Sequence, residues 1–157
     1  MNLEKGKFYE ESNRRINIIF VFRYLFSDVR VPAISDKKEA MDRVVWERLV
    51  HAICMVESGC DDNAKNKTSS ACGRFQMLRV YVDEVNRIKG KKVYSYNDRF
   101  DPLKAREMFE IYQQHYNPNK DIDRAIILHR GKVSKKYIKN VKENMRYGKE
   151  DIRCLLW

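Results

Sequence analysis

The sequence predicts an all-α fold. Apolar residues recur at intervals of three and four along most of the chain, which is the spacing of one helix face. Capping residues, glycines and prolines divide these stretches into short helices, and no convincing pair of strands is visible. The chain has 157 residues, of which 43% are hydrophobic and only 3 are Pro and 6 are Gly. We therefore expect a helical extension at residues 1–35, packed on one domain at residues 36–157.

An apolar segment at residues 16–26 follows Arg14 and Arg15, as in a signal peptide. However, Asn17 and Arg23 interrupt it, no small-residue cleavage site follows, and it is far shorter than the roughly 20 residues that span a bilayer. We interpret it as a buried helix of the extension, with a membrane-interacting element as the alternative. Without a clear signal peptide in this chain, we expect export through a signal already removed, or through a phage or secretion machine.

The first helix of the domain is predicted at residues 37–57. Asp36 and Glu39 have the spacing of a capping box, and an apolar face follows them. Ser58-Gly59 ends the helix, because glycine is a natural C-cap. The next residues, 60–70, are almost entirely polar and predict a loop. The apolar face contains Ala40, Met41, Val44, Val45, Leu49, Ala52, Ile53 and Val56.

A short helix is predicted at residues 80–88, where valines and isoleucine recur at helical spacing and Gly90 follows. The next segment, 91–96, contains Val93 and Tyr94, which favour strands. We expect a small β-hairpin there.

Three more helices are expected towards the C-terminus. One begins at Asp101, an N-cap followed by proline, and the next begins at Asp121 or Asp123 and ends at Gly131. Ser134 caps the last helix. The predicted buried faces are Ala105, Met108, Phe109, Tyr112 and Tyr116 in the first and Tyr137, Ile138, Val141 and Met145 in the third, while the second runs through Ala125, Ile126, Ile127 and Leu128.

The four cysteines, at positions 54, 60, 72 and 154, contain no C-x2-C element. This spacing argues against a structural zinc site, and we predict neither a metal nor a cofactor. Cys60 and Cys72 bracket the polar loop, so a disulfide between them is one prediction and reduced thiols are the other.

Glu57 is the acidic residue that best fits a catalytic role. It ends a mostly apolar helix, just before the polar loop. Burial raises the pKa of a carboxyl group, and the negative end of the helix dipole acts in the same direction. A carboxyl group that stays protonated near neutral pH is suited to general acid catalysis. The alternative is a glutamate in a solvated last turn.

The surrounding motifs resemble the soluble lytic transglycosylases (SLT family), relatives of goose-type lysozyme. Glu57-Ser58-Gly59 is followed by Asn63-Ala64 and by Gly73-Arg74-Phe75-Gln76-Met77, where the family has a Gly-Leu-Met-Gln turn. The segment Ala125 to Gly131 falls where the family has its Ala-x-x-x-Tyr-Asn motif. The resemblance covers residues 40–145 and implies a lysozyme-like, SLT-type helical domain that cleaves peptidoglycan.

The resemblance also implies roles for individual residues. Glu57 would act as general acid and then as base, giving 1,6-anhydro products. Ser58 and Gln76 would orient the substrate or the glutamate, and the alternative is a structural role in which they hydrogen-bond the loop. His129-Arg130 replaces the family's Tyr-Asn pair, or Leu128-His129 does if Gly131 is aligned with the family's glycine. Both His129 and Arg130 are candidate substrate-binding residues. In the family the tyrosine hydrogen-bonds the catalytic carboxylate. We expect either that His129 donates this bond or that it is a satisfied histidine at a helix end.

A hydrolytic muramidase is the main alternative, because an inverting hydrolase needs a second carboxylate to activate water. The sequence singles out no such residue. The positional candidates are Asp61, Asp62, Asp83, Asp98 and Asp101.

The net charge of +10 predicts polyanionic partners, which include nucleic acid, an anionic membrane and the bacterial envelope. With the resemblance, we expect a monomer that binds peptidoglycan glycan strands in the periplasm or cell wall, or in association with a phage. A phage virion or a conjugation or secretion apparatus is a candidate partner. A nucleic-acid-binding or catalytically degenerate scaffold is the other class, because the last helix carries a lysine-rich face.

Overall fold

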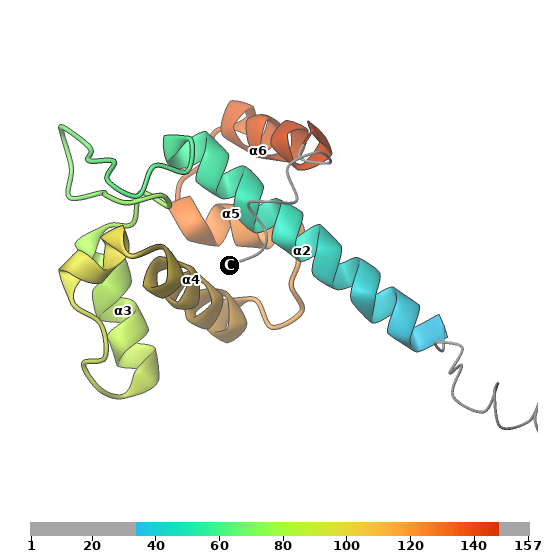
Figure 1. Cartoon of the computed structure of the whole chain (residues 1–157), viewed down its shortest axis with the longest axis horizontal. Coiled ribbons are helices and arrows are strands. Elements are labelled where there is room, and N and C mark those ends of the chain that lie inside the picture. Colours follow the sequence, from blue (N-terminus) through green and yellow to red (C-terminus); the bar gives the residue numbers. More distant parts are fainter. Residues whose placement is uncertain (1–33, 148–157) are drawn as a thin grey trace, which may run out of the picture. The chain divides into compact units, whose positions relative to one another are not determined.

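The computed structural model describes residues 34–147, which form five α-helices and one short 3-10 helix (Figure 1). Apart from the helices, these residues contain only two isolated β-bridges, so the predicted all-α class is confirmed. Residues 40–147 belong to one compact unit, and residues 34–39 are described only as the first turns of α2. Residues 1–33 of the expected extension, with its apolar segment 16–26, and Cys154 lie outside the described residues, and residues 34 and 35 begin α2. The elements are α2 (Ile34–Ser58), α3 (Arg79–Lys89), η1 (Tyr96–Phe100), α4 (Pro102–Tyr116), α5 (Ile122–Arg130) and α6 (Lys135–Tyr147).

The core lies between the apolar faces of these helices. α3 packs against α4, α4 against α5, and α5 against α6. Phe109 of α4 is fully buried and stacks on Phe75, with 5.5 Å between the ring centroids. This stack ties the loop that follows α2 to the helical core. Other fully buried side chains are Leu49 and Ile53 of α2, Val82 and Val85 of α3, Met108 of α4, Ile126 of α5 and Val141 of α6.

The predicted ends of the later helices agree with the structure because they depend on local hydrogen bonds. The predicted capping box at Asp36 is wrong, because α2 begins at Ile34 and Asp36 lies within its first turn. The side chain of Asp101 accepts bonds from two backbone N–H groups in the first turn of α4, at 2.9 and 3.0 Å. Asp121 accepts one at the start of α5 and Ser134 one at the start of α6. Gly90 ends α3 with a φ of 68°, a left-handed conformation that glycine adopts without strain.

The predicted hairpin at residues 91–96 is wrong. Residues 91–95 form no strand, and η1 begins at Tyr96. The side chain of Asn86 accepts hydrogen bonds from the N–H groups of Val93 and Tyr94, at 2.8 and 2.9 Å, and donates to the Tyr94 carbonyl at 2.9 Å. One amide side chain thus supplies the partners that a second strand would have supplied.

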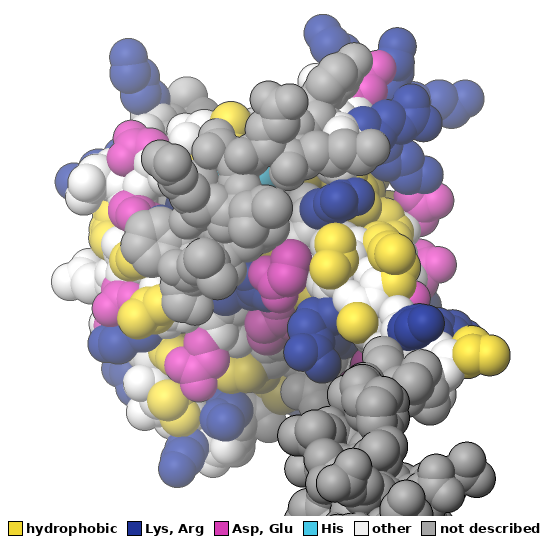
Figure 2. Space-filling view, turned by 45° about the vertical axis from the view of Figure 1, so that its right-hand side comes forward, with side chains coloured by type: hydrophobic (Ala, Val, Ile, Leu, Met, Phe, Trp, Pro, Cys, Tyr) yellow, Lys and Arg dark blue, Asp and Glu magenta, His cyan; other side chains and the backbone are white. Residues whose placement is uncertain are grey.

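The surface of the described residues is rich in charge. Figure 2 shows Lys and Arg side chains spread over the visible face, with Asp and Glu between them. On α6, Tyr137 and Val141 are buried while Lys135, Lys136 and Lys139 are exposed, as the sequence predicts. No stretch within residues 34–147 forms a helix with the length and apolar character needed to cross a membrane.

Candidate active site

Glu57 lies in the last turn of α2, and its side chain is only 9% exposed. It lines a cavity of about 640 Å³ that extends between the loop after α2 and helices α3, α4 and α5. The wall of this cavity is mixed, with aromatic and aliphatic side chains beside a few polar groups, which is typical of ligand sites. Its polar and aromatic lining residues include Asn66, Ser69, Gln76, Tyr81, Glu84, Tyr112, His129 and Arg130.

Two groups from the C-terminal part of the chain contact the Glu57 carboxylate. The hydroxyl of Tyr137, on α6, donates a hydrogen bond to Oε1 of Glu57. Nη1 of Arg130, at the end of α5, lies 3.6 Å from the same oxygen. The Arg130 guanidinium also stacks over the Tyr137 ring, 4.5 Å from its centroid. Burial, and then the Glu57 carboxylate, raise the pKa of Tyr137 well above its ordinary value, so this hydroxyl keeps its proton.

The expected hydrogen bond from His129 to Glu57 is not the one that the structure contains. Nε2 of His129 lies 2.9 Å from the carbonyl oxygen of Phe75, and the imidazole is packed among the rings of Phe75, Tyr81 and Phe109. Burial lowers the pKa of His129, which outweighs the opposing effects of Glu57 and of the Phe75 carbonyl. Tyr137 therefore makes the hydrogen bond to Glu57 that the resemblance implied for His129. His129 is at a helix end, but it is not the satisfied histidine of the alternative prediction, because its Nδ1 is buried with no hydrogen-bond partner among the described residues.

Ser58 and Gln76 both make hydrogen bonds that shape the loop after α2. The hydroxyl of Ser58 donates to the Arg74 carbonyl at 2.8 Å and accepts from the N–H of Asp61 at 3.1 Å. Gln76 lines the cavity, with its side-chain amide donating to the Gly73 carbonyl at 3.0 Å. These bonds fix the loop relative to Glu57. Contact of Ser58 or Gln76 with substrate stays a prediction.

Three further contacts hold this loop in place. The guanidinium of Arg99, only 5% exposed, donates to the carbonyls of Ser70 and Met77, at 2.6 and 2.9 Å. A methyl group on Gly73 would lie 1.9 Å from the Arg99 carbonyl oxygen, so only glycine fits there. Arg74, which stands where the family has leucine, forms an ion pair with Asp62, 2.5 Å from Nε to Oδ1. The turn that carries Gln76 is therefore packed directly on η1.

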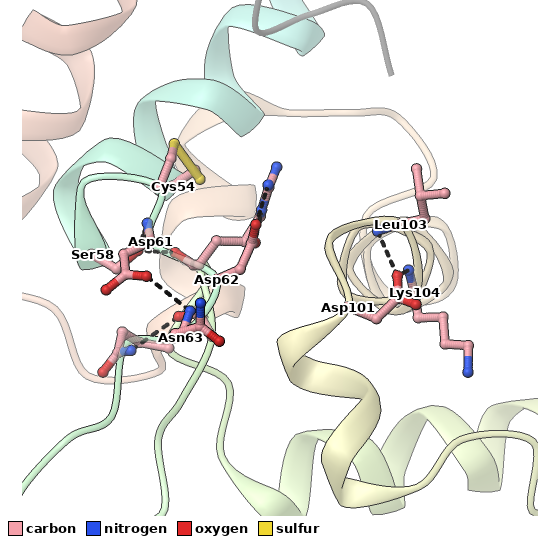
Figure 3. A network of polar contacts seen from close by, with 12 residues as sticks. Cys54, Ser58, Asp61, Asp62, Asn63, Asp101, Leu103 and Lys104 are labelled. Atoms are coloured by element: carbon pink, nitrogen blue, oxygen red, sulfur yellow. Dashed lines mark hydrogen bonds and ion pairs between the residues drawn. A yellow bond between two sulfur atoms is a disulfide. The ribbon is translucent and has the colours of Figure 1, made fainter.

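The expected disulfide between Cys60 and Cys72 is wrong. Cys60 is bonded to Cys54 in the preceding turn of α2, with 4.9 Å between the two Cα atoms, and Cys72 is a buried free thiol. Figure 3 shows this disulfide beside Ser58 and Asp61, where the chain turns back on itself after α2. A left-handed φ of 61° at Cys60 makes this return possible, and no pattern in the sequence indicates it.

None of the five aspartates named as candidates for a second carboxylate lines the Glu57 cavity. For example, Asp62 forms an ion pair with Arg74, and Asp101 caps α4. The sequence analysis instead missed Glu84, which lines the same cavity as Glu57. Hydrogen bonds from Arg87 and then Tyr116 lower the pKa of Glu84 to about 2, so it is ionised. The sequence places Glu84 on the predicted helix at residues 80–88 but does not show that this helix borders the cavity. Within residues 34–147, no cluster of His, Cys, Asp or Glu is suited to hold a metal ion.

Comparison with known proteins identifies the family. The model of the transglycosylase SLT domain matches residues 35–127, which include α2 with Glu57, the loop with Gln76 and all of α3 and α4. No curated protein and no solved structure matches the chain. Tyr137, His129 and Arg130 lie beyond the matched residues, and the fold brings them to the same cavity. The chain therefore belongs to the transglycosylase SLT domain family, the lysozyme-like lytic transglycosylases that cleave peptidoglycan.

Proposed function

We propose that this protein cleaves the MurNAc-β-1,4-GlcNAc bond of peptidoglycan by the transglycosylase route, with Glu57 as the catalytic residue. The observation that supports this best is the environment of Glu57. A carboxylate that is 9% exposed faces a substrate-sized cavity and accepts a hydrogen bond from a buried tyrosine hydroxyl. Ser58 and Gln76 keep the loop in place around it, and Gln76 contacts the bound glycan.

In this mechanism Glu57 works twice. Its protonated form gives a proton to the glycosidic oxygen as the bond to the anomeric carbon breaks and positive charge develops on the muramic ring. The resulting carboxylate then takes the proton of the muramic C6 hydroxyl, whose oxygen attacks the anomeric carbon and closes the 1,6-anhydro ring. Tyr137 donates its hydrogen bond most strongly to the carboxylate form, so it stabilises the charge that Glu57 acquires as the proton leaves.

Hydrolysis is the second candidate, and Glu84 is the observation that favours it. This ionised carboxylate lines the same cavity and is a possible base for a water molecule. However, both of its oxygens already accept hydrogen bonds from Arg87, and one also accepts from Tyr116. We therefore favour the route that needs one carboxyl group only.

The test is digestion of purified peptidoglycan by the parent protein and by Glu57→Gln. We expect the variant to lose activity by a factor of about 10² to 10⁴, which is the usual contribution of a general acid. Glu143→Gln, on α6, is the matched control and should digest at the parent rate, because the Glu143 side chain is 45% exposed and does not line the cavity. Mass spectrometry of the products decides the route, because anhydro ends are lighter by one water than hydrolysed ends. Full activity in Glu57→Gln would contradict the proposal.

The substrate also bears on where the protein acts and what it contacts. Peptidoglycan lies outside the cytoplasm, and a net charge of +10 holds the protein on this anionic polymer. We propose a monomer that reaches the wall with a phage virion or with a conjugation or secretion apparatus.

A further inference from the structure

Arg130 is the one cationic side chain that lines the Glu57 cavity among the residues that the structure describes. It is the last residue of α5, and Gly131 turns the chain away directly after it with a φ of 76°. The side chain is 52% exposed, whereas that of Glu57 is 9% exposed. The guanidinium thus lies at the open side of the cavity, above a buried carboxylate.

Glu57 does not use the hydrogen-bonding capacity of this guanidinium. The 3.6 Å between Nη1 of Arg130 and Oε1 of Glu57 is longer than a hydrogen bond, and Tyr137 already donates to that oxygen. Within residues 34–147, Glu57 is the one carboxylate with which Arg130 forms an ion pair. A guanidinium has five N–H donors in a planar fork, which matches the two oxygens of a carboxylate.

The stack on Tyr137 holds this fork in place. With 4.5 Å between the guanidinium carbon and the ring centroid, the ring limits the rotamers of Arg130. The edge of the guanidinium, which carries the N–H donors, belongs to a side chain that lines the cavity and is 52% exposed. Less side-chain entropy is then lost when a ligand binds. An anionic group on the glycan is therefore the natural partner of this edge.

We propose that Arg130 binds a carboxylate of the peptidoglycan strand and so selects muramic acid, rather than N-acetylglucosamine, for the sugar beside Glu57. This inference rests on the proposed function, whose substrate it specifies. Two groups of the polymer have this chemistry: the lactyl carboxylate of a muramic acid without a peptide, and the carboxylates of an attached peptide stem. N-acetylglucosamine carries neither.

The test is equilibrium binding of the full chain to three GlcNAc-MurNAc disaccharides, measured by titration calorimetry at low salt. One has a free lactyl carboxylate, one has the lactyl group as a carboxamide, and one carries a short acidic peptide on it. None contains a MurNAc-β-1,4-GlcNAc bond, so the protein cannot cleave them. We expect the parent to bind a carboxylate probe about 10- to 100-fold more tightly than the carboxamide, as for a charge-assisted hydrogen bond. The tighter of the two acidic probes identifies the source of the carboxylate.

The variants show whether Arg130 is responsible. Arg130→Leu should remove the preference and leave binding of the carboxamide unchanged, and Arg130→Lys should keep part of it because the charge remains. Lys132→Leu is the matched control, since it removes an exposed cation that does not line the cavity, and should behave as the parent.

Three results would overturn the inference. The parent could bind the carboxylate and carboxamide disaccharides equally, the preference for a carboxylate could survive in Arg130→Leu, or Arg130→Leu could lose affinity equally for all three disaccharides. Failure of the parent to digest intact peptidoglycan would instead contradict the proposed function. The binding comparison would still decide the role of Arg130, because it requires no cleavage.

Discussion

Removing the Tyr137 hydroxyl tests the Glu57 site most directly. In Tyr137→Phe the ring stays, so its packing on α6 and under Arg130 is kept, while the hydrogen bond to Oε1 of Glu57 is lost. Tyr137 is 7% exposed and the Glu57 side chain 9%, so only water in the cavity that Glu57 lines could replace the missing donor. The variant thus removes the contacts of the hydroxyl with Glu57 and Arg130 and keeps the ring.

The expected size of the effect follows from this geometry. A hydrogen bond to a charged group contributes about 1.5 to 3 kcal/mol, and each 1.36 kcal/mol is tenfold in rate. The hydrogen bond from Tyr137 reaches its full strength only when Glu57 becomes a carboxylate in the transition state. We therefore expect kcat/KM to fall by about 10- to 150-fold, with most of the loss in kcat. Arg130, at 3.6 Å, is too far away to donate a replacement bond without moving.

The assay is the release of soluble fragments from purified peptidoglycan, with the melting temperature measured in parallel. Tyr96→Phe is the matched control: it also loses a hydroxyl that bonds a carboxylate, Asp83, but Tyr96 is 43% exposed and does not line the Glu57 cavity. It should keep the parent activity. A folded Tyr137→Phe protein with parent kcat/KM would refute the reasoning.

Two further predictions concern stability. Gly73→Ala should lower the free energy of unfolding by more than about 2 kcal/mol, because its Cβ would lie 1.9 Å from the Arg99 carbonyl oxygen. Gly59→Ala, at a φ of 67° with nothing within 4 Å, should cost only about 1 kcal/mol in chemical denaturation, and equal losses would contradict the assigned contact. His129 is kept neutral by burial, which lowers its pKa, while the unfolded chain takes up a proton below about pH 6.5. The stability that it contributes is thus present above that pH and is lost as the pH falls towards the lower folded pKa, so urea unfolding should show a steeper acid-side decline in the parent than in His129→Gln.

The helices could be predicted from the sequence because their ends are decided locally. Asp101, Asp121 and Ser134 cap the residues that directly follow them, and the α6 periodicity gives its buried face. The hairpin prediction was wrong because the partners of residues 91–95 are not decided by their own sequence. Strand preference at Val93 and Tyr94 was outweighed by one side chain, Asn86, that the helical pattern of α3 left unexplained.

The candidate site could be predicted only in part. The position of Glu57 at the end of an apolar helix is a local feature, and its place in a cavity agrees with the catalytic prediction without testing it. The partners of Glu57 depend on how α5 and α6 pack against α2. The family's Tyr-Asn pair aligns with His129-Arg130 or, in the neighbouring frame, with Leu128-His129, and the sequence does not show that the hydrogen bond to Glu57 comes from Tyr137 instead of His129.

The Cys54–Cys60 bond has a consequence for the motions of Glu57. The ends of α-helices fray, because their last carbonyl groups lack partners inside the helix. Here the two half-cystines, six positions apart, enclose Glu57 and Ser58 in a small covalent ring. The terminal turn of α2 therefore cannot unwind far while the bond is intact. Its amide protons should exchange with solvent at a rate set by opening of the core instead of by fraying, which makes hydrogen exchange at this turn a direct measure of how firmly the carboxylate is held.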